Sequence, residues 1–131
     1  MKLRLEWNEK FSVGIPEIDA QHKVLFDIAN SIPEEPDERK VRTCIVRIFK
    51  YCREHFSFEE ETMRKMEYPK DSMDEHARIH EQLIDRLSQV ATMPLNTIEA
   101  NEEFKRFTVM WITEHILGKD QEFGEFAKHQ R

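Results

Sequence analysis

Apolar residues recur every three or four positions along four long segments of this 131-residue chain. That interval places them on one face of an α-helix, whereas a half-buried strand would alternate every second residue. Prolines lie in each of the three intervals between the segments, and proline interrupts helices. The pattern therefore predicts helices over residues 19–32, 37–66, 71–92 and 96–117.

The intervals between these segments are short, so consecutive helices are expected to pack as antiparallel neighbours. The expected fold class is all-α, an up-down-up-down antiparallel four-helix bundle. Residues 1–18 lack helical periodicity and are expected to form an N-terminal arm against the bundle, while residues 119–127 are expected to form a short C-terminal helix. A chain of this length suits a single domain with one core, spanning residues 1–131.

The ends of the helices carry more specific signals. Asp19 is a good N-cap for the first helix, and the fourth helix is expected to start near Asn96 or Thr97. Ser72 can cap the third helix, with Glu75 three residues on as its capping-box partner.

Composition and charge exclude several kinds of function. Charged residues make up 35% of the chain with a net charge of −6, and the two signs are interspersed, which is typical of a solvated helical surface. No basic patch is present for nucleic acid, and no apolar run approaches the roughly 20 residues of a membrane span. Residues 1–7 lack the apolar core of a signal peptide. The abundance of surface charge favours a monomer.

Two cysteines, Cys44 and Cys52, lie eight residues apart in one predicted helix. At the rise of an α-helix they would sit roughly 12 Å apart, whereas a disulfide needs Cα atoms within about 7 Å. We expect both to be reduced, half-buried packing residues, which fits a cytoplasmic location.

Histidines and carboxylates interrupt the apolar faces of all four predicted helices. The set comprises His22, His55, Glu59, His76, His80, His115 and Asp120. Within two pairs, His55 with Glu59 and His76 with His80, the residues are one helical turn apart, so both members can reach a common point.

A single inward histidine is more often a hydrogen-bonded core residue than a metal ligand. Five of them in one small core would each need a polar partner, and the remaining sequence offers few. The joint pattern therefore predicts a metal site. His129 fits no part of the pattern and is expected to be exposed in the tail.

Asp120 is the member of the set that a regular helix would not bring to the site. Five residues at 100° each turn it about 140° away from His115. Gly118 lies between them and could permit a break or a local widening to i→i+5 hydrogen bonding. We therefore predict that the fourth helix is distorted between His115 and Asp120.

Five neutral imidazoles and two carboxylates suit iron and tolerate zinc, copper or nickel. Seven ligands are too many for one tetrahedral zinc ion but suit two six-coordinate ions that share bridges. Two bridging carboxylates and one bridging oxygen give each ion three ligands. Three histidines then complete one ion, and two histidines leave the other with an open position.

The spacing of these residues resembles the hemerythrins, and closely their single-domain bacterial branch. The family pattern H…HxxxE…HxxxH…HxxxxD is complete here, and the resemblance covers roughly residues 5–127. The opening also matches, with Trp7…Val13-Gly14-Ile15…Ile18-Asp19…Gln21-His22. The resemblance implies two iron ions (Fe2+/Fe3+) bridged by Glu59, Asp120 and an oxo or hydroxo group.

The resemblance also implies a division of roles. The coordinatively saturated iron would be bound by His76, His80 and His115. The iron with the open position, where dioxygen would bind, would be held by His22 and His55. An apolar wall around that position would exclude water and protons. By resemblance, this oxygen pocket is lined by Leu25, Phe56, Trp111, Ile112 and Ile116.

Reversible dioxygen binding for transport, storage or delivery is the favoured function. Two alternatives remain open: a di-iron oxygen or redox sensor module, which is usually fused to signalling domains, and a di-iron redox enzyme that handles peroxide or nitric oxide. No extra general acid or base is evident near the ligand motifs, so we do not expect an enzyme. The expected partner is dioxygen, and no oxygen-accepting protein can be named from the sequence.

Overall fold

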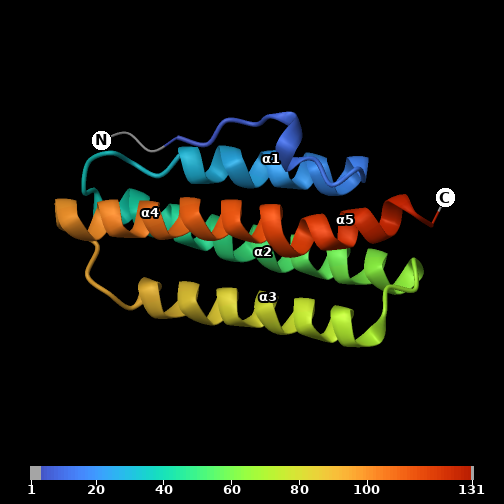
Figure 1. Cartoon of the computed structure of the whole chain (residues 1–131). Helices are drawn as coiled ribbons and strands as arrows, with labels where there is room; N and C mark the ends of the chain where they lie inside the picture. Colours follow the sequence, from blue (N-terminus) through green and yellow to red (C-terminus); the bar gives the residue numbers. More distant parts are fainter. Residues whose placement is uncertain (1–3, 131) are drawn as a thin grey trace.

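The computed structural model describes residues 4–130, and they are helical over most of that range, with no strand (Figure 1). The long helices are α1 (Pro16–Asn30), α2 (Glu38–Lys65), α3 (Lys70–Ala91) and α4 (Ile98–His115). A π-helical turn, η2 (Ile116–Asp120), joins α4 to α5 (Gln121–Lys128), and a single 3-10 turn, η1 (Glu9–Phe11), lies in the N-terminal arm.

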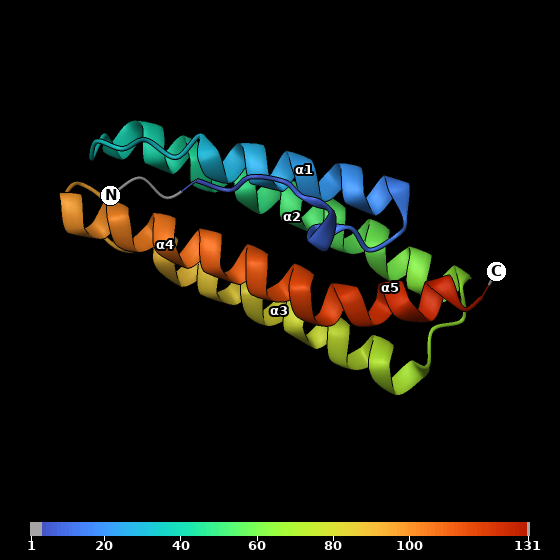
Figure 2. The ribbon, with the colours of Figure 1, turned by 45° about the horizontal axis from the view of Figure 1, so that its top comes forward.

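Consecutive long helices run in opposite directions, as Figures 1 and 2 show. The helix α2 contacts both α1 and α3, and α4 returns beside α1. Two of the helix starts agree with local capping chemistry: Asp37 accepts a hydrogen bond from Lys40 N, and Thr97 accepts one from Ala100 N. The prediction of an all-α, up-down-up-down four-helix bundle is confirmed.

The predicted start of the first helix at Asp19 is wrong. The helix α1 begins three residues earlier, at Pro16, where a proline costs no hydrogen bond because the first helical N–H groups have no partner in the helix. Asp19 lies inside the first turn, and its carboxylate accepts hydrogen bonds from Ser12 Oγ at 2.6 Å and Val13 N at 2.8 Å. It anchors the arm rather than capping the helix.

The predicted capping box of the third helix is also wrong. The helix α3 begins at Lys70, directly after Pro69, and no side chain caps it. The carbonyl of Pro69 already accepts a hydrogen bond from Met73 N, so Ser72 and Glu75 lie within the first turns of the helix. Glu75 instead pairs with Lys119 of η2 at 3.0 Å.

The fourth helix and the C-terminal helix follow one another without a loop between them. The predicted segments 96–117 and 119–127 form one helical rod from Ile98 to Lys128, with one widened turn inside it (Figure 1). The flanking residues His115 and Gln121 both keep right-handed helical backbone angles, so the chain does not break at Gly118.

The N-terminal arm runs lengthwise along the bundle between α1 and α4 (Figure 2). At its start, the backbone of Leu5 exchanges two hydrogen bonds with the Asn30 side chain, and further on the ring of Phe11 packs edge-on against Phe26 with centroids 5.0 Å apart. At its end, Gln121 Nε2 donates to the carbonyls of Lys10 and Ser12. The arm predicted for residues 1–18 therefore exists up to the start of α1; residues 1–3 lie outside the described part.

Both cysteines are free, and they are buried rather than half-buried. Burial raises the pKa of the Cys52 thiol to about 12, which keeps it protonated at neutral pH. Within residues 4–130, the helices are too short or too polar to cross a membrane.

Candidate metal centre

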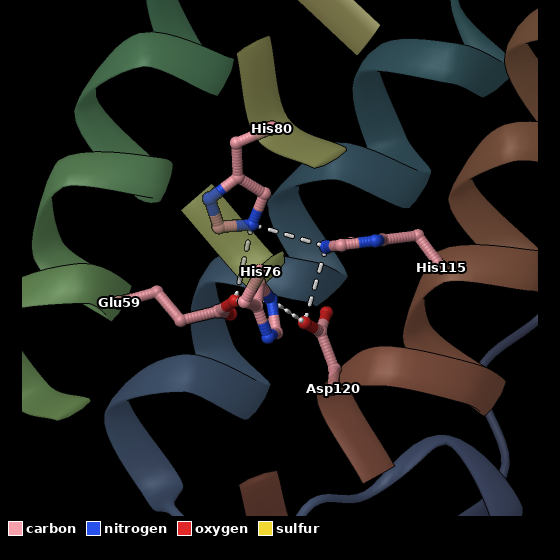
Figure 3. A group of neighbouring side chains, drawn as sticks. All are labelled: Glu59, His76, His80, His115 and Asp120. Atoms are coloured by element: carbon pink, nitrogen blue, oxygen red, sulfur yellow. Dashed lines mark hydrogen bonds and ion pairs between the residues drawn. The ribbon is translucent and has the colours of Figure 1, made fainter. Parts of the chain in front are cut away.

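All seven predicted ligand side chains meet in the middle of the bundle, and each is at most 8% exposed. Every long helix contributes to the site, and Figure 3 shows how five of the side chains converge. His22 comes from α1, His55 and Glu59 from α2, His76 and His80 from α3, His115 from α4, and Asp120 from the π-helical turn η2. His129, by contrast, is exposed beside Glu125, as predicted.

The structure divides the histidines into two groups that share both carboxylates. One group contains His76, His80 and His115; the other contains His22 and His55. Within each group, one nitrogen or oxygen of every member, Glu59 and Asp120 included, lies within 4.8 Å of all the others. We refer to these as the three-histidine group and the two-histidine group.

Glu59 turns a different oxygen toward each group. Its Oε1 lies 2.7 Å from His76 Nε2 and 3.3 Å from His80 Nε2, on the three-histidine side. Its Oε2 lies 3.4 Å from His55 Nε2 and 3.7 Å from His22 Nε2, on the other side. A carboxylate in this orientation can bridge two metal ions, one through each oxygen.

Asp120 has the same orientation. Its Oδ1 lies 3.0 Å from His76 Nε2 and 3.2 Å from His115 Nε2, while its Oδ2 lies 3.1 Å from His22 Nε2. Both carboxylates therefore face both groups, and all five imidazoles face them through Nε2.

The hydrogen-bonding state and the spacing of the polar atoms at the site suit bound cations. None of the four oxygens of Glu59 and Asp120 takes part in a hydrogen bond of good geometry, although all are buried, and a buried carboxylate without partners is costly. Two pairs of Nε2 atoms, in His22 with His55 and in His80 with His115, lie 3.1 Å apart. With metal–nitrogen bonds of about 2.1 Å, two ligands at right angles on one ion lie about 3.0 Å apart. The residues therefore fit a pair of metal ions.

The electrostatics of the site favour positive charge. Burial lowers the pKa of His22, but contact with Asp120 and Glu59 outweighs it and raises the pKa to about 9; the same balance raises the pKa of His76 to about 9. Burial likewise raises the pKa of Glu59 and of Asp120, yet the surrounding histidines hold both well below their usual range. The two carboxylates are therefore ionised and stabilise cations at the centre.

The π-helical turn brings Asp120 to the site. In a regular helix, Asp120 would point about 140° away from His115, whereas i→i+5 hydrogen bonding places residues five apart on nearly the same face. The predicted distortion between these residues is confirmed. The part assigned to Gly118 is not supported, because its φ is not positive and a Cβ added there would meet nothing within 4 Å.

Sequence reasoning missed two residues outside the ligand set. Gln21 Oε1 accepts a hydrogen bond from His55 Nδ1 at 2.6 Å, and Glu60 Oε2 accepts one from His80 Nδ1 at 2.7 Å. Metal-binding histidines usually donate their second ring N–H in this way. Each residue is next to a predicted ligand in the chain, but adjacency gives no signal, because neighbours on a helix point 100° apart and each partner lies on another helix.

The five residues predicted to line the oxygen pocket are all buried, and they belong to one apolar cluster. The Phe56 ring stacks on the His80 ring with centroids 3.8 Å apart and planes 4° apart, and Trp111 lies edge-on to Phe56. The Phe56 ring therefore lies against the three-histidine group, and its centroid is also 5.7 Å from that of His55 in the two-histidine group. Their role toward oxygen stays a prediction.

Comparisons with known proteins agree with this geometry. The family model described as the hemerythrin HHE cation binding domain matches residues 13–127. The chain is 31% identical over 126 residues to a bacteriohemerythrin of Clostridium acetobutylicum, which covers 89% of this chain and 96% of the relative. It is 28% identical over 127 residues to a bacteriohemerythrin of Stenotrophomonas maltophilia (95% and 82% covered).

A myohemerythrin is similar at the same level. The chain is 28% identical over 115 residues to a myohemerythrin of Theromyzon tessulatum, with 88% of this chain and 87% of the relative covered. The family match over most of the chain and the buried cluster of five histidines and two carboxylates agree with each other. The chain belongs to the hemerythrin family, whose domain binds a di-iron centre.

Proposed function

We propose that this protein binds dioxygen reversibly at its di-iron centre and serves in oxygen transport, storage or delivery. The observation that carries the proposal is the unequal division of five histidines between two groups that share Glu59 and Asp120. Because Glu59 and Asp120 belong to both groups, the two-histidine group offers its ion one protein ligand fewer than the three-histidine group does. Two ferrous ions, one in each group, would supply an open coordination position on the two-histidine side and the electrons for reversible binding of dioxygen.

Each ligand has one proposed role. His76, His80 and His115 hold the saturated iron, and His22 and His55 hold the iron that receives dioxygen. Glu59 and Asp120 bind both ions, which is supported by the way each carboxylate turns one oxygen toward each group.

The apolar cluster keeps water and protons away from the centre. We assign this role to the buried side chains of Leu25, Phe56, Trp111, Ile112 and Ile116. Two protons that reached the site, with one electron from each ferrous ion, would turn dioxygen into hydrogen peroxide and leave both irons ferric. An apolar wall slows that loss, since none of these five side chains carries an acidic group that could deliver a proton.

The ligand set favours a carrier over an enzyme. Five of the seven ligands are neutral imidazoles, and neutral ligands stabilise high-valent iron less than carboxylates do. The predicted pocket residues also include no carboxyl, imidazole or lysine group that could act as a general acid or base.

Two further features belong to the proposal. A single hemerythrin domain is supported by the continuous family match over residues 13–127. The proposed monomeric state rests on the charged residues that make up 35% of the chain. A reducing compartment such as the cytoplasm is supported by the two free, buried cysteines, Cys44 and Cys52.

The test is an iron count combined with oxygen cycling. Purified protein loaded with ferrous iron should hold two irons per chain and develop a visible charge-transfer band under oxygen that disappears under argon through repeated cycles. A band that does not reverse, or steady consumption of peroxide or nitric oxide by the loaded protein, would replace the carrier with a redox enzyme.

A further inference from the structure

The two histidine groups differ in the charge of the residue that accepts the Nδ1 hydrogen bond of one histidine in each group. In the three-histidine group, His80 Nδ1 donates to the carboxylate of Glu60 at 2.7 Å. In the two-histidine group, His55 Nδ1 donates to the amide oxygen of Gln21 at 2.6 Å. The two hydrogen bonds have similar lengths, so what separates them is a negative charge.

That charge reaches the metal through the imidazole ring. A carboxylate that accepts the Nδ1 proton draws it away from the ring and makes Nε2 a stronger electron donor, whereas a neutral amide does so less. A negative charge near an iron also stabilises the ferric ion over the ferrous ion. Both effects lower the tendency of that iron to take up one electron.

The orientation of His80 is held from two directions. Glu60, on α2, reaches across to His80 on α3 through the hydrogen bond, and the ring of Phe56 stacks flat against the imidazole at 3.8 Å. The Nδ1–H therefore points at Glu60, and Nε2 points at Glu59 and His115. This fixed orientation keeps the carboxylate and the metal position on opposite edges of the same ring.

We propose that Glu60 and Gln21 are positioning residues that make the two iron positions electronically unequal, with the three-histidine iron the harder of the two to reduce. The inference rests on the proposed di-iron function and deepens it. Dioxygen would then bind at the iron of the two-histidine group, where His55 donates to the neutral amide of Gln21. The iron of the three-histidine group, where His80 donates to the Glu60 carboxylate, would be the more electron-rich of the two.

The surroundings of Glu60 limit how far its charge lowers the reduction potential of the three-histidine iron, and they allow that shift to be measured. Its side chain is 31% exposed and lines a groove of about 610 Å³ between α2 and α3, together with charged residues of both signs such as Arg53 and Asp74. Water in the groove screens part of the charge. The same groove gives small redox mediators an approach to the His80 edge of the centre.

The test is an anaerobic redox titration of the iron-loaded full chain, in which each ferric ion takes up one electron. Glu60→Gln keeps a side-chain oxygen that can accept the hydrogen bond but removes the charge, and it should raise the potential of the lower of the two steps. Gln21→Glu adds a charge on the other side and should lower the upper step. The control is Glu61→Gln, which removes a carboxylate that pairs with Arg64 at the surface, and it should move neither step.

A second measurement separates charge from positioning. Glu60→Ala removes the hydrogen bond itself and should lower the affinity for iron by about 10- to 100-fold in competition with a ferrous chelator, whereas Glu60→Gln should retain iron. The inference is overturned if Glu60→Gln and Gln21→Glu leave both steps in place, or if Glu61→Gln shifts them equally. A wild-type chain that does not bind two irons would overturn the underlying di-iron function as well.

Discussion

Two helical segments of this protein each present a histidine and a carboxylate to the metal centre, and they do so by different means. In α2, His55 and Glu59 are four residues apart on an unbroken α-helix. Between α4 and α5, His115 and Asp120 are five residues apart and meet only because η2 is a π-helical turn. The first pair follows from helix geometry alone, whereas the second requires the backbone to leave that geometry.

The surroundings of the second segment indicate what keeps the turn widened. Gln121, the residue after Asp120, donates two hydrogen bonds to the N-terminal arm. Gly124 lies so close to the arm that an added Cβ would be 2.5 Å from the backbone oxygen of Val13. On its other side, Lys119 pairs with Glu75 of α3 at 3.0 Å. We infer that these contacts with other segments of the chain stabilise the irregular turn.

The largest expected effect comes from removing either carboxylate. Because Glu59 and Asp120 both face both histidine groups, Glu59→Ala and Asp120→Ala should each reduce the iron content from two per chain to well below one, measured by elemental analysis after loading. Glu61→Ala on the exposed face of α2 serves as the control. Two irons retained in Asp120→Ala would mean that the π-helical turn is dispensable for the site.

A carboxyl group placed inside the turn should have the next largest effect. Ile116 opens η2 and is 1% exposed in the apolar cluster. Ile116→Glu would introduce a proton donor, and the oxygen-dependent absorbance should decay about 10²-fold faster, the lower end of what a positioned general acid contributes. Ile116→Gln is the matched control, since it is polar but does not supply a proton at neutral pH. An unchanged decay would remove Ile116 from the proposed pocket.

Separating the arm from α5 should cost stability. In Gly124→Ala the new methyl group would collide with the backbone of Val13, which cannot move aside without displacing the arm. We expect the free energy of unfolding to fall by about 1–3 kcal/mol, measured by urea denaturation of the metal-free protein. A variant as stable as the wild type would show that the arm can shift freely and does not support the turn.

The smallest effect is expected at Gly118, inside the turn itself. Its φ is not positive, and an added Cβ has open space, so Gly118→Ala should raise the free energy of unfolding by about 0.4–1 kcal/mol through the loss of freedom in the unfolded chain. Iron content should stay at two per chain. Loss of iron in this variant would show that the glycine, rather than the distant contacts, permits the widened turn.

Errors in the sequence predictions lie where a side chain with a local capping signal binds a residue outside its own helix. Asp19 is a residue type that commonly forms an N-cap, but the helix starts earlier, at Pro16. The Asp19 carboxylate instead accepts hydrogen bonds from Ser12 and Val13 of the arm. Ser72 and Glu75 have the spacing of a capping box, but α3 begins before them, at Lys70 directly after Pro69. Glu75 pairs with Lys119 of η2 instead. Asp19 and Glu75 therefore bind residues outside their own helices, Asp19 in the preceding arm and Glu75 in a segment far along the chain.

The sequence by itself determined the helices, the helix pairs with four-residue spacing, and the set of seven buried ligand-type residues, because periodicity and residue chemistry are local properties. Only the tertiary structure decided how Asp120 reaches the site and which oxygen of each carboxylate faces which histidines. It also decided that Glu60 and Gln21 accept hydrogen bonds from two of the imidazoles. These features depend on distances between segments far apart in the chain. Packing sets such distances, and no spacing within one helix encodes them.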